Sequence, residues 1–374
     1  MRTIKTDTNL VKYLKTLVEM PTVSSDFHAN NKAITYISEF LSEYRFLVKE
    51  FEFDNHSAIF ATTQRTKIPK VILYGHVDVV DAPASMFELT EDDTRLYGRG
   101  TIDMKYAIAS YLDIVTSHQT SLGKLNIGIM IVTDEEIGGG SANKILQLGY
   151  GGTVAVVPDG GKDWIFEDAC KGAWTVKANS SGVGVHGSRP WEGDSASFRL
   201  LDFLTETKDL FADQGTETHT LNISQITTTS KSDGTIKENP QNRVPHQASA
   251  TLDIRYTSKK DLEGIEKSIT RIAENHRINL EIIATYPSTN HELTNPLVNG
   301  FVKRIIPNTN NKLKTMLSSG ANDSSYFEAA GIPCAVVCPP GWGKHADDEW
   351  IDKEGFKIFT EALDRFIVEF ATIE

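Results

Sequence analysis

The sequence predicts an α/β fold: a mixed, mostly parallel sheet with helices on both faces, interrupted by an inserted α+β domain of two layers. Apolar, β-branched runs alternate with helical patterns before about residue 174, which is typical of parallel strands joined by helices. The chain then becomes polar and rich in glycine, serine and threonine, and α/β character returns near Asn295. We therefore expect two domains, one of them inserted into the other.

The first region supplies the expected sheet and its helices. In chain order we predict a strand at 71–74, a helix at 104–117, a strand at 125–132, a helix at 141–149 and a strand at 153–157. The helix from Met104 places five apolar side chains on one stripe, which we expect to be buried against the sheet: Ala107, Ile108, Tyr111, Leu112 and Val115.

The inserted region has a different pattern. An alternating strand at 251–256, a helix at 261–276 and a strand at 279–285 indicate a small α+β sandwich. Near the end of the chain, 333–339 resembles a buried strand and 354–373 an amphipathic closing helix. We accordingly expect one domain made of 1–174 and 286–374, with a second domain inserted at 175–285.

Composition excludes several classes of partner. The 374 residues include 38 Lys and Arg against 50 Asp and Glu, a net charge of −12, and contain no long basic run, so nucleic acid is not expected as a partner. No run approaches the roughly 20 apolar residues of a membrane span, and the start lacks the features of a signal peptide. We expect a cytoplasmic protein without a membrane partner, whose three cysteines are inert buried thiols.

Polar residues follow the predicted parallel strands at the edge where ligands bind in such sheets. They are His76 and Asp78 after the first strand, Asp134, Glu135 and Glu136 after the second, Asp159 after the third, and His345 after the run at 333–339. A further carboxylate, Asp103, follows Gly98 and Gly100 at the expected start of a helix.

Two of these groups suggest a division of labour. His76 and Asp78 are two residues apart in an extended segment and project to the same side, so Asp78 can hold the second ring nitrogen of a ligating His76. Glu135 and Glu136 are adjacent and point apart, so one carboxylate can bind a metal while the other remains a free base.

Each motif alone also fits an ordinary loop: a solvated His-x-Asp, an acidic turn, an aspartate before glycines or a surface histidine. Their convergence changes this interpretation. Two histidines and several carboxylates at the strand ends of one sheet form an oxygen and nitrogen set suited to Zn²⁺ or a similar divalent ion.

These motifs also resemble a known family. GHVDVV, GRGTIDMK, DEEIGG, PDGG and GKHADDEW occur in order and are similar to those of the di-zinc family of aminoacylases, acetylornithine deacetylase, succinyl-diaminopimelate desuccinylase, glutamate carboxypeptidase and carnosinase-type dipeptidases. The segment 11–25 is similar to the family's opening helix, and 180–196, 238–245 and 250–256 are similar to its lid motifs.

The resemblance implies two Zn²⁺ ions per subunit, with Co²⁺ or Mn²⁺ as substitutes. It implies His76 and Asp159 on one ion, Glu136 and His345 on the other, and Asp103 between them. Glu135 is then the general base, and the peptide bond after Asp103 is expected to be cis.

The resemblance implies that 1–174 and 286–374 form a catalytic domain and that 175–285 form a lid domain, and it assigns roles to residues of the lid. His186 is implied to stabilise the developing oxyanion, often across a dimer interface, which predicts a homodimer through the lid domain. Asn242 and Arg255 are implied to hold a substrate carboxylate, and Gly320 and Asn322 to form another substrate-binding loop.

The implied reaction is hydrolysis of an amide bond in a small substrate that carries a free carboxylate. Asp159 stands where the family's deacylases usually have glutamate, which favours a dipeptide or C-terminal peptide bond. The short chain and compact lid are more similar to the deacylases and carboxypeptidases, which keeps open the alternative of an N-acyl amino acid deacylase of the acetylornithine or succinyl-diaminopimelate type. An inactive binding module remains open, and a two-metal phosphoesterase is disfavoured because no phosphate-binding glycine loop is evident.

Overall fold

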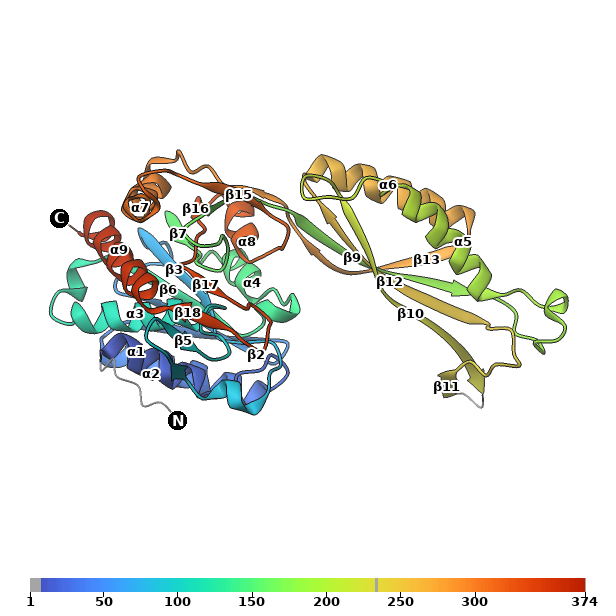
Figure 1. Cartoon of the computed structure of the whole chain (residues 1–374), viewed down its shortest axis with the longest axis horizontal. Helices are drawn as coiled ribbons and strands as arrows, with labels where there is room; N and C mark the ends of the chain where they lie inside the picture. The colour runs from blue at the N-terminus through green and yellow to red at the C-terminus, as the bar shows by residue number, and fades with distance from the viewer. Residues whose placement is uncertain (1–7, 233–234, 374) are drawn as a thin grey trace. The chain divides into compact units, whose positions relative to one another are not determined.

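A computed structural model describes residues 8–232 and 235–373, which form two compact units (Figure 1). The first unit takes in the chain up to Ala169, Asn290–Ser318 and the chain from Asn322 onward. The second comprises Cys170–Thr289 together with Ser319–Ala321. The lid limits expected from the sequence, 175 and 285, lie a few residues inside these bounds.

The first unit is built on a six-stranded sheet of order β1-β2-β6-β3-β7-β16. The strands β6, β3, β7 and β16 run parallel, whereas β1 and β2 are antiparallel to their neighbours. The mixed, mostly parallel sheet predicted from the sequence is therefore confirmed. The bounds are β1 Leu47–Phe53, β2 His56–Thr62, β3 Val71–His76, β6 Ile127–Val132, β7 Val154–Val156 and β16 Cys334–Ala335.

Two groups of helices pack on this sheet. The helices α3, α7 and α9 lie together on one side in Figure 1, and α4 and α8 lie together on the other. The predicted apolar stripe of α3 is buried because the helix packs between β3, α1 and α9. The bounds are α1 Asn9–Val18, α2 Phe27–Glu43, α3 Lys105–Ser117, α4 Ser141–Gln147, α7 Pro296–Ile305, α8 Ser324–Ala329 and α9 Lys353–Ala371.

A small sheet of order β17-β18-β5-β4 joins two distant parts of the chain. The strand β18 pairs with β5 and β17, so the segment leading to Asp103 lies beside the loop that carries His345. Its bounds are β4 Thr90–Glu91, β5 Arg95–Tyr97, β17 Gly341–Trp342 and β18 Trp350–Asp352. A three-stranded sheet has the order β14-β8-β15, with bounds Thr289–Asn290, Phe166–Cys170 and Thr315–Ser318.

The second unit is a two-layer α+β sandwich. Its antiparallel sheet has the order β11-β10-β12-β9-β13 and is covered by α5 and α6. Alternate residues of β12 are buried, which gives the sheet one apolar face for the helices. The bounds are β9 Gly172–Ser181, α5 Ala196–Asp209, β10 Thr220–Ser232, β11 Thr235–Glu238, β12 Gln247–Tyr256, α6 Lys259–Asn275 and β13 Ile278–Tyr286.

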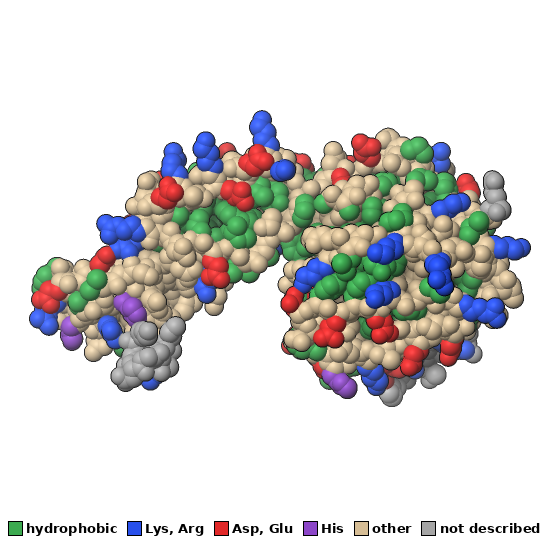
Figure 2. All heavy atoms as spheres, turned by 180° about the vertical axis from the view of Figure 1, so that it is seen from behind, with side chains coloured by type: hydrophobic (Ala, Val, Ile, Leu, Met, Phe, Trp, Pro, Cys, Tyr) green, Lys and Arg blue, Asp and Glu red, His purple; other side chains and the backbone are tan. Residues whose placement is uncertain are grey.

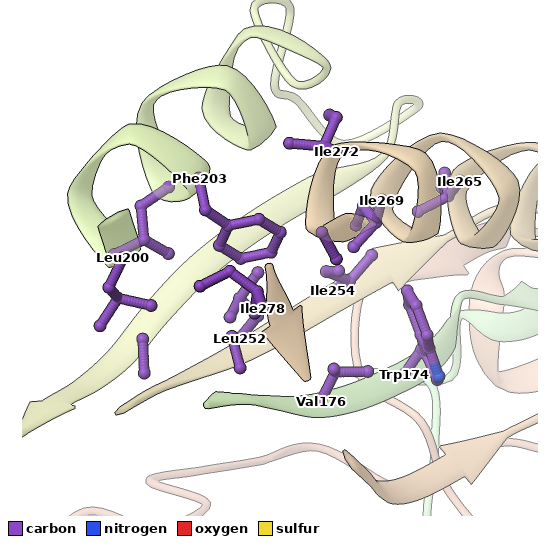
Figure 3. Close-up of a cluster of buried hydrophobic side chains, with 14 of the residues drawn as sticks. Trp174, Val176, Leu200, Phe203, Leu252, Ile254, Ile265, Ile269, Ile272 and Ile278 are labelled. Carbon is purple, nitrogen blue, oxygen red and sulfur yellow. The ribbon is translucent and has the colours of Figure 1, made fainter. Parts of the chain in front are cut away.

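The core of this second unit is shown in Figure 3. Phe203 of α5 and Ile269 of α6 point toward Leu252 and Ile254 of β12, and all four side chains are buried. The unit therefore has an apolar core of its own, separate from the sheet that carries the polar strand ends.

The surface carries charges of both signs. In Figure 2, basic and acidic side chains are interspersed on the face that is shown. Among the described residues, no helix is both long and apolar enough to span a bilayer.

Candidate metal centre

His76 presents an unpartnered ring nitrogen to two carboxylates. It ends β3 and is fully buried, and its Nδ1 lies 2.9 Å from the backbone oxygen of Asp78. Donation from Nδ1 to that oxygen leaves the Nε2 lone pair free. Nε2 lies 3.7 Å from Oδ1 of Asp103 and 3.8 Å from Oδ1 of Asp159, and within the described chain it has no hydrogen-bond partner. A divalent cation would complete this arrangement.

The carboxylate of Asp78 makes further contacts besides the predicted one with His76. Its Oδ1 is 3.5 Å from Nδ1 of His76, farther than the backbone oxygen of the same residue. Its two oxygens accept hydrogen bonds from the backbone N–H groups of Glu135 and Glu136, at 3.4 and 3.2 Å, and from Ser24 at 3.0 Å. Asp78 thus connects the end of β3 to the acidic turn after β6.

Asp103 lies between two groups of potential ligands. Oδ1 faces His76, whereas Oδ2 lies 3.4 Å from Nε2 of His345, which is also 2.8 Å from Oε2 of Glu136. The two groups, His76–Asp103–Asp159 and Asp103–Glu136–His345, each have ligand atoms close enough to hold one ion. The peptide bond between Asp103 and Met104 is cis, as predicted. All five predicted ligands are therefore brought together.

The donor set of these groups fits zinc or a similar divalent ion. It consists of imidazole nitrogens and carboxylate oxygens, and no sulfur is included. The three cysteines are buried thiols, as expected, and burial raises the pKa of Cys338 to about 11. Cobalt and manganese accept the same kinds of ligand, so the geometry is compatible with all three metals.

Glu135 and Glu136 diverge at the start of a short 3-10 helix, Glu135–Ile137. The carboxylate of Glu136 is committed to His345, whereas Glu135 belongs to neither ligand group. Burial, reinforced by the charge of Asp159, raises the pKa of Glu135 well above its ordinary value. A raised pKa makes a carboxylate a stronger proton acceptor, which is compatible with the predicted role of Glu135 as general base.

Glu349 holds the loop that carries Asp103. Its side chain is fully buried, and its Oε1 accepts hydrogen bonds from the backbone N–H groups of Ile102 and Asp103 at 2.8 and 3.1 Å. Its Oε2 accepts from the backbone of Gly100 at 2.8 Å and from Arg99 at 2.9 Å. Because Glu349 is only four residues beyond His345, it ties the two loops of the centre together. The sequence analysis missed it, although it lies inside the motif GKHADDEW.

Lys344 is the second residue that the sequence analysis missed. Its ammonium group lies 3.2 Å from Oδ1 of Asp103 and 3.1 Å from Oδ1 of Asp159, the oxygens that also face His76. It also donates to the backbone oxygen of Asp159 at 2.9 Å. A cation is thus already drawn to these carboxylates from within the chain, and it occupies the oxygens that a metal ion would need.

Asp323 is a further buried carboxylate near the centre. Asp323 accepts a hydrogen bond of 2.5 Å from the hydroxyl of Tyr74, and both side chains are buried. Burial raises the pKa of Asp323 to about 7, and the charges of Asp134 and Asp159 act in the same direction. No sequence pattern selects Asp323, because it follows a turn and not an apolar strand.

The predicted lid residues lie in the second unit. His186 is exposed, its Nδ1 lies 2.8 Å from the hydroxyl of Ser188, and its backbone forms a β-bridge with Arg243, beside Asn242. Arg255 is engaged with its neighbour Asp253 through Nε at 3.0 Å and Nη2 at 3.2 Å. A substrate carboxylate would have to replace this pair, and the roles of these residues stay predictions.

The loop that contains Gly320 and Asn322 is divided between the units. Gly320 accepts a hydrogen bond from the thiol of Cys170 in the second unit. Asn322 belongs to the first unit and is buried, where its amide donates to Glu167 at 3.1 Å and accepts from the backbone of Ser324 at 3.0 Å. These contacts use both ends of the Asn322 side chain for structure, so its predicted contact with substrate remains untested.

The sequence is similar to a known protein family and to proteins of known name. The model of Peptidase family M20/M25/M40 matches residues 72–369. A probable succinyl-diaminopimelate desuccinylase of Staphylococcus aureus is 25% identical over 407 residues, which cover 96% of this chain and 98% of the relative.

Two solved structures share the fold. A metallo-carboxypeptidase of the M20 family from Sulfolobus solfataricus gives a TM-score of 0.78 at 14% identity, covering 97% of this chain and 99% of the other. A tripeptidase from Staphylococcus aureus gives 0.76 at 19% identity, covering 96% and 97%. At these identities the likeness establishes the fold.

The position of Glu349 leads to a testable prediction. In Glu349→Gln an amide group would face the backbone N–H donors, and Arg99 would lose its buried charged partner. We expect the zinc affinity to fall about 10- to 100-fold. The free energy of unfolding should fall by about 3–5 kcal/mol. Competition with a chromophoric chelator and chemical unfolding measure the two effects. Glu354→Gln, an exposed change in the first turn of α9, is the control. Unaltered zinc affinity in Glu349→Gln would show that the loop does not need this carboxylate.

The position of Lys344 leads to a second prediction. Lys344→Met removes the ammonium group that competes for Asp103 and Asp159, so we expect zinc to bind about tenfold more tightly, the equivalent of roughly 1.4 kcal/mol. Chelator competition on the metal-stripped protein measures this. Lys357→Met, which changes an exposed lysine of α9, is the control. Weaker binding in Lys344→Met would instead mean that the lysine organises the carboxylates for the metal.

Proposed function

We propose that this chain works with two zinc ions. The premise is that it belongs to Peptidase family M20/M25/M40 and is a metal-dependent hydrolase of amide bonds. The supporting observation is the position of Asp103, whose two oxygens face different ligand groups. His76 and Asp159 would complete one ion's site, and Glu136 and His345 the other. Ions bound there would polarise the substrate carbonyl and lower the pKa of water toward ~7.

The residues around the ions have separate tasks in this proposal. Glu135 is outside both ligand groups and takes the proton of the attacking water, then delivers it to the nitrogen of the leaving amine. Asp78 holds the backbone of Glu135 and Glu136, so it fixes the direction of the base and of one ligand. No covalent bond between the chain and the substrate is required.

The substrate is a small amide that carries a free carboxylate, and two classes remain in competition. Asp159 favours a dipeptide or C-terminal peptide bond, as in the di- and tripeptidases that the chain resembles. The alternative, an N-acyl amino acid, is favoured by the relative named as a desuccinylase, which aligns with nearly the whole chain. The bond broken is a carbon–nitrogen amide bond in both cases, so one catalytic arrangement serves either class.

The task of Glu135 can be tested separately from metal binding. In Glu135→Ala the ligand groups are untouched, so we expect two zinc ions per chain to remain while turnover falls by about 10²–10⁴-fold, the usual contribution of a general base. Elemental analysis gives the metal content and an amine-release assay gives the rate. Glu354→Ala is the matched control. Near-normal turnover in Glu135→Ala would remove this residue from the proposed reaction.

The substrate class can be decided by a hydrolysis screen. Zinc-loaded protein is given a panel of dipeptides alongside N-acetyl and N-succinyl amino acids, with Glu135→Ala as the blank. We expect dipeptides to be cleaved at the higher kcat/KM. Preferential release of acetate or succinate would establish the deacylase alternative, whereas turnover of neither group by protein with both metals bound would refute the proposed function.

A further inference from the structure

Glu167 is a fully buried carboxylate of the first unit that the proposed reaction does not use. It lies on β8, and its backbone N–H donates to the backbone oxygen of Val336 at 3.0 Å. Its Oε1 accepts a hydrogen bond from the amide of Asn322 at 3.1 Å and lies 3.9 Å from Nε2 of His291, which is also buried. A carboxylate without access to water depends on such neighbours for compensation. Glu167 and the polar groups around it therefore fix one another's positions.

The same carboxylate lies against the turn that follows the metal ligand Asp159. A Cβ on Gly160 would lie 2.5 Å from Oε2 of Glu167, so the carboxylate packs directly on this glycine. Burial raises the pKa of Glu167, and a hydrogen bond from the backbone N–H of Gly161 is among the contacts that lower it. The turn is therefore in contact with Glu167 at both of the residues that directly follow Asp159.

His291 joins Glu167 to a second carboxylate. Its Nδ1 lies 2.7 Å from Oε2 of Glu328, and its Nε2 lies 3.2 Å from the hydroxyl of Ser324. Glu328 also accepts a hydrogen bond of 3.1 Å from the backbone N–H of Asn290 through its Oε1. An imidazole that contacts polar groups through both nitrogens is held in one orientation, so these residues form one connected network. We call the side chains of this network the Glu167 cluster: Glu167, His291, Asn322, Ser324 and Glu328.

The Glu167 cluster lies in the first unit, on the segments through which the chain leaves and re-enters that unit. Glu167 precedes the first departure by a few residues, and His291 follows the corresponding return. Ser318, which also contacts Glu167, and Asn322 flank the residues 319–321, which belong to the second unit. The strands β8, β14 and β15 of these segments form one three-stranded sheet. Glu167 thus belongs to one of the four connecting segments and lies beside the other three.

We propose that Glu167 is a positioning residue that fixes the turn after Asp159 against the segments that connect the two units. It acts through the backbone of Gly161 on one side and through Asn322 and His291 on the other. A metal ion held by Asp159 would restrain the turn and, through Glu167, the connecting segments within the first unit. The inference rests on the proposed function, because it places a metal ion at Asp159.

Zinc binding by single-site variants tests this positioning. His345→Ala leaves the ligand group that contains Asp159, whereas Asp159→Asn leaves the group that contains Glu136. Glu167→Gln has one acceptor oxygen in place of two. Added to the first variant it should weaken zinc binding about tenfold, as expected when a residue that orients a ligand is lost, and added to the second it should change nothing. Chelator competition measures both, with the exposed Glu354→Gln as the matched control. Equal weakening in both backgrounds, or none in the first, overturns the inference.

Hydrogen exchange tests the same coupling without any change in the Glu167 cluster. The backbone N–H groups of Glu167 and His291 are hydrogen-bonded, to Val336 and Asp168. With zinc at ten times its dissociation constant, exchange of both in the wild-type protein should slow by about tenfold, since opening there would release the ion.

The single-site variants assign this slowing to one ligand group. His345→Ala should retain the slowing, and Asp159→Asn should lose it. Zinc binding by both ligand groups without this difference overturns the inference alone. The absence of zinc binding by either group would overturn the proposed function, and the inference with it.

Discussion

The concentration of carboxylates in a water-poor site is the constraint on which the rest of the first unit depends. Asp78, Asp103 and Asp159 are buried, and the side chain of Glu136 is only 4% exposed. Each charge loses solvation, and each is repelled by the others, so the group is stable only if cations or protons compensate. Every unusual feature of the centre is a response to this requirement.

The chain shows three such responses. Lys344 brings an ammonium group onto Asp103 and Asp159. Hydrogen bonds to Asp103 and Glu136 raise the pKa of His345 to about 10, so it gains positive charge more readily. Glu135 lies outside both ligand groups, and burial together with the charge of Asp159 raises its pKa, so that its neutral, protonated form is favoured. Bound divalent cations would meet the same need more fully, because each supplies two charges at the shared oxygens.

Backbone hydrogen bonds solve the geometric part of the problem. Asp78 and Glu349 accept from the N–H groups of the two loops that carry ligands. Asp134 does the same for the turn after Glu136, accepting from the backbone of Gly140 at 2.9 Å and of Ser141 at 3.1 Å. A Cβ on Gly139 would lie 1.9 Å from the Asp134 carboxylate, so glycine is required there. Carboxylates outside the two ligand groups thus fix the loops that carry the carboxylates within them.

The fold class and the grouping of the ligand residues could be predicted, because both depend on patterns that are local in the chain. The strand before His76 and the strand before Glu135 are continuous apolar runs, and parallel neighbours bring their ends to one edge. Lys344 and Glu349 could not be selected in this way. Their partners, Asp103 and Asp159 for the lysine and the loop from Arg99 for Glu349, are more than 180 residues away in the sequence. Only the pairing of β18 with β5 makes those contacts possible.

The same buried carboxylates surround Glu135, so its proposed action as a base would depend on bound metal ions. In the metal-free chain, burial and the neighbouring Asp159 favour its protonated form, in which it cannot accept a proton. Metal ions bound to Asp103 and Asp159 would offset this repulsion and would lower the pKa of Glu135. A residue outside both ligand groups therefore responds to their occupancy through charge alone. In the proposed reaction, the ions that would polarise the substrate would also keep Glu135 ionised, so both effects would depend on occupancy of the same two ligand groups.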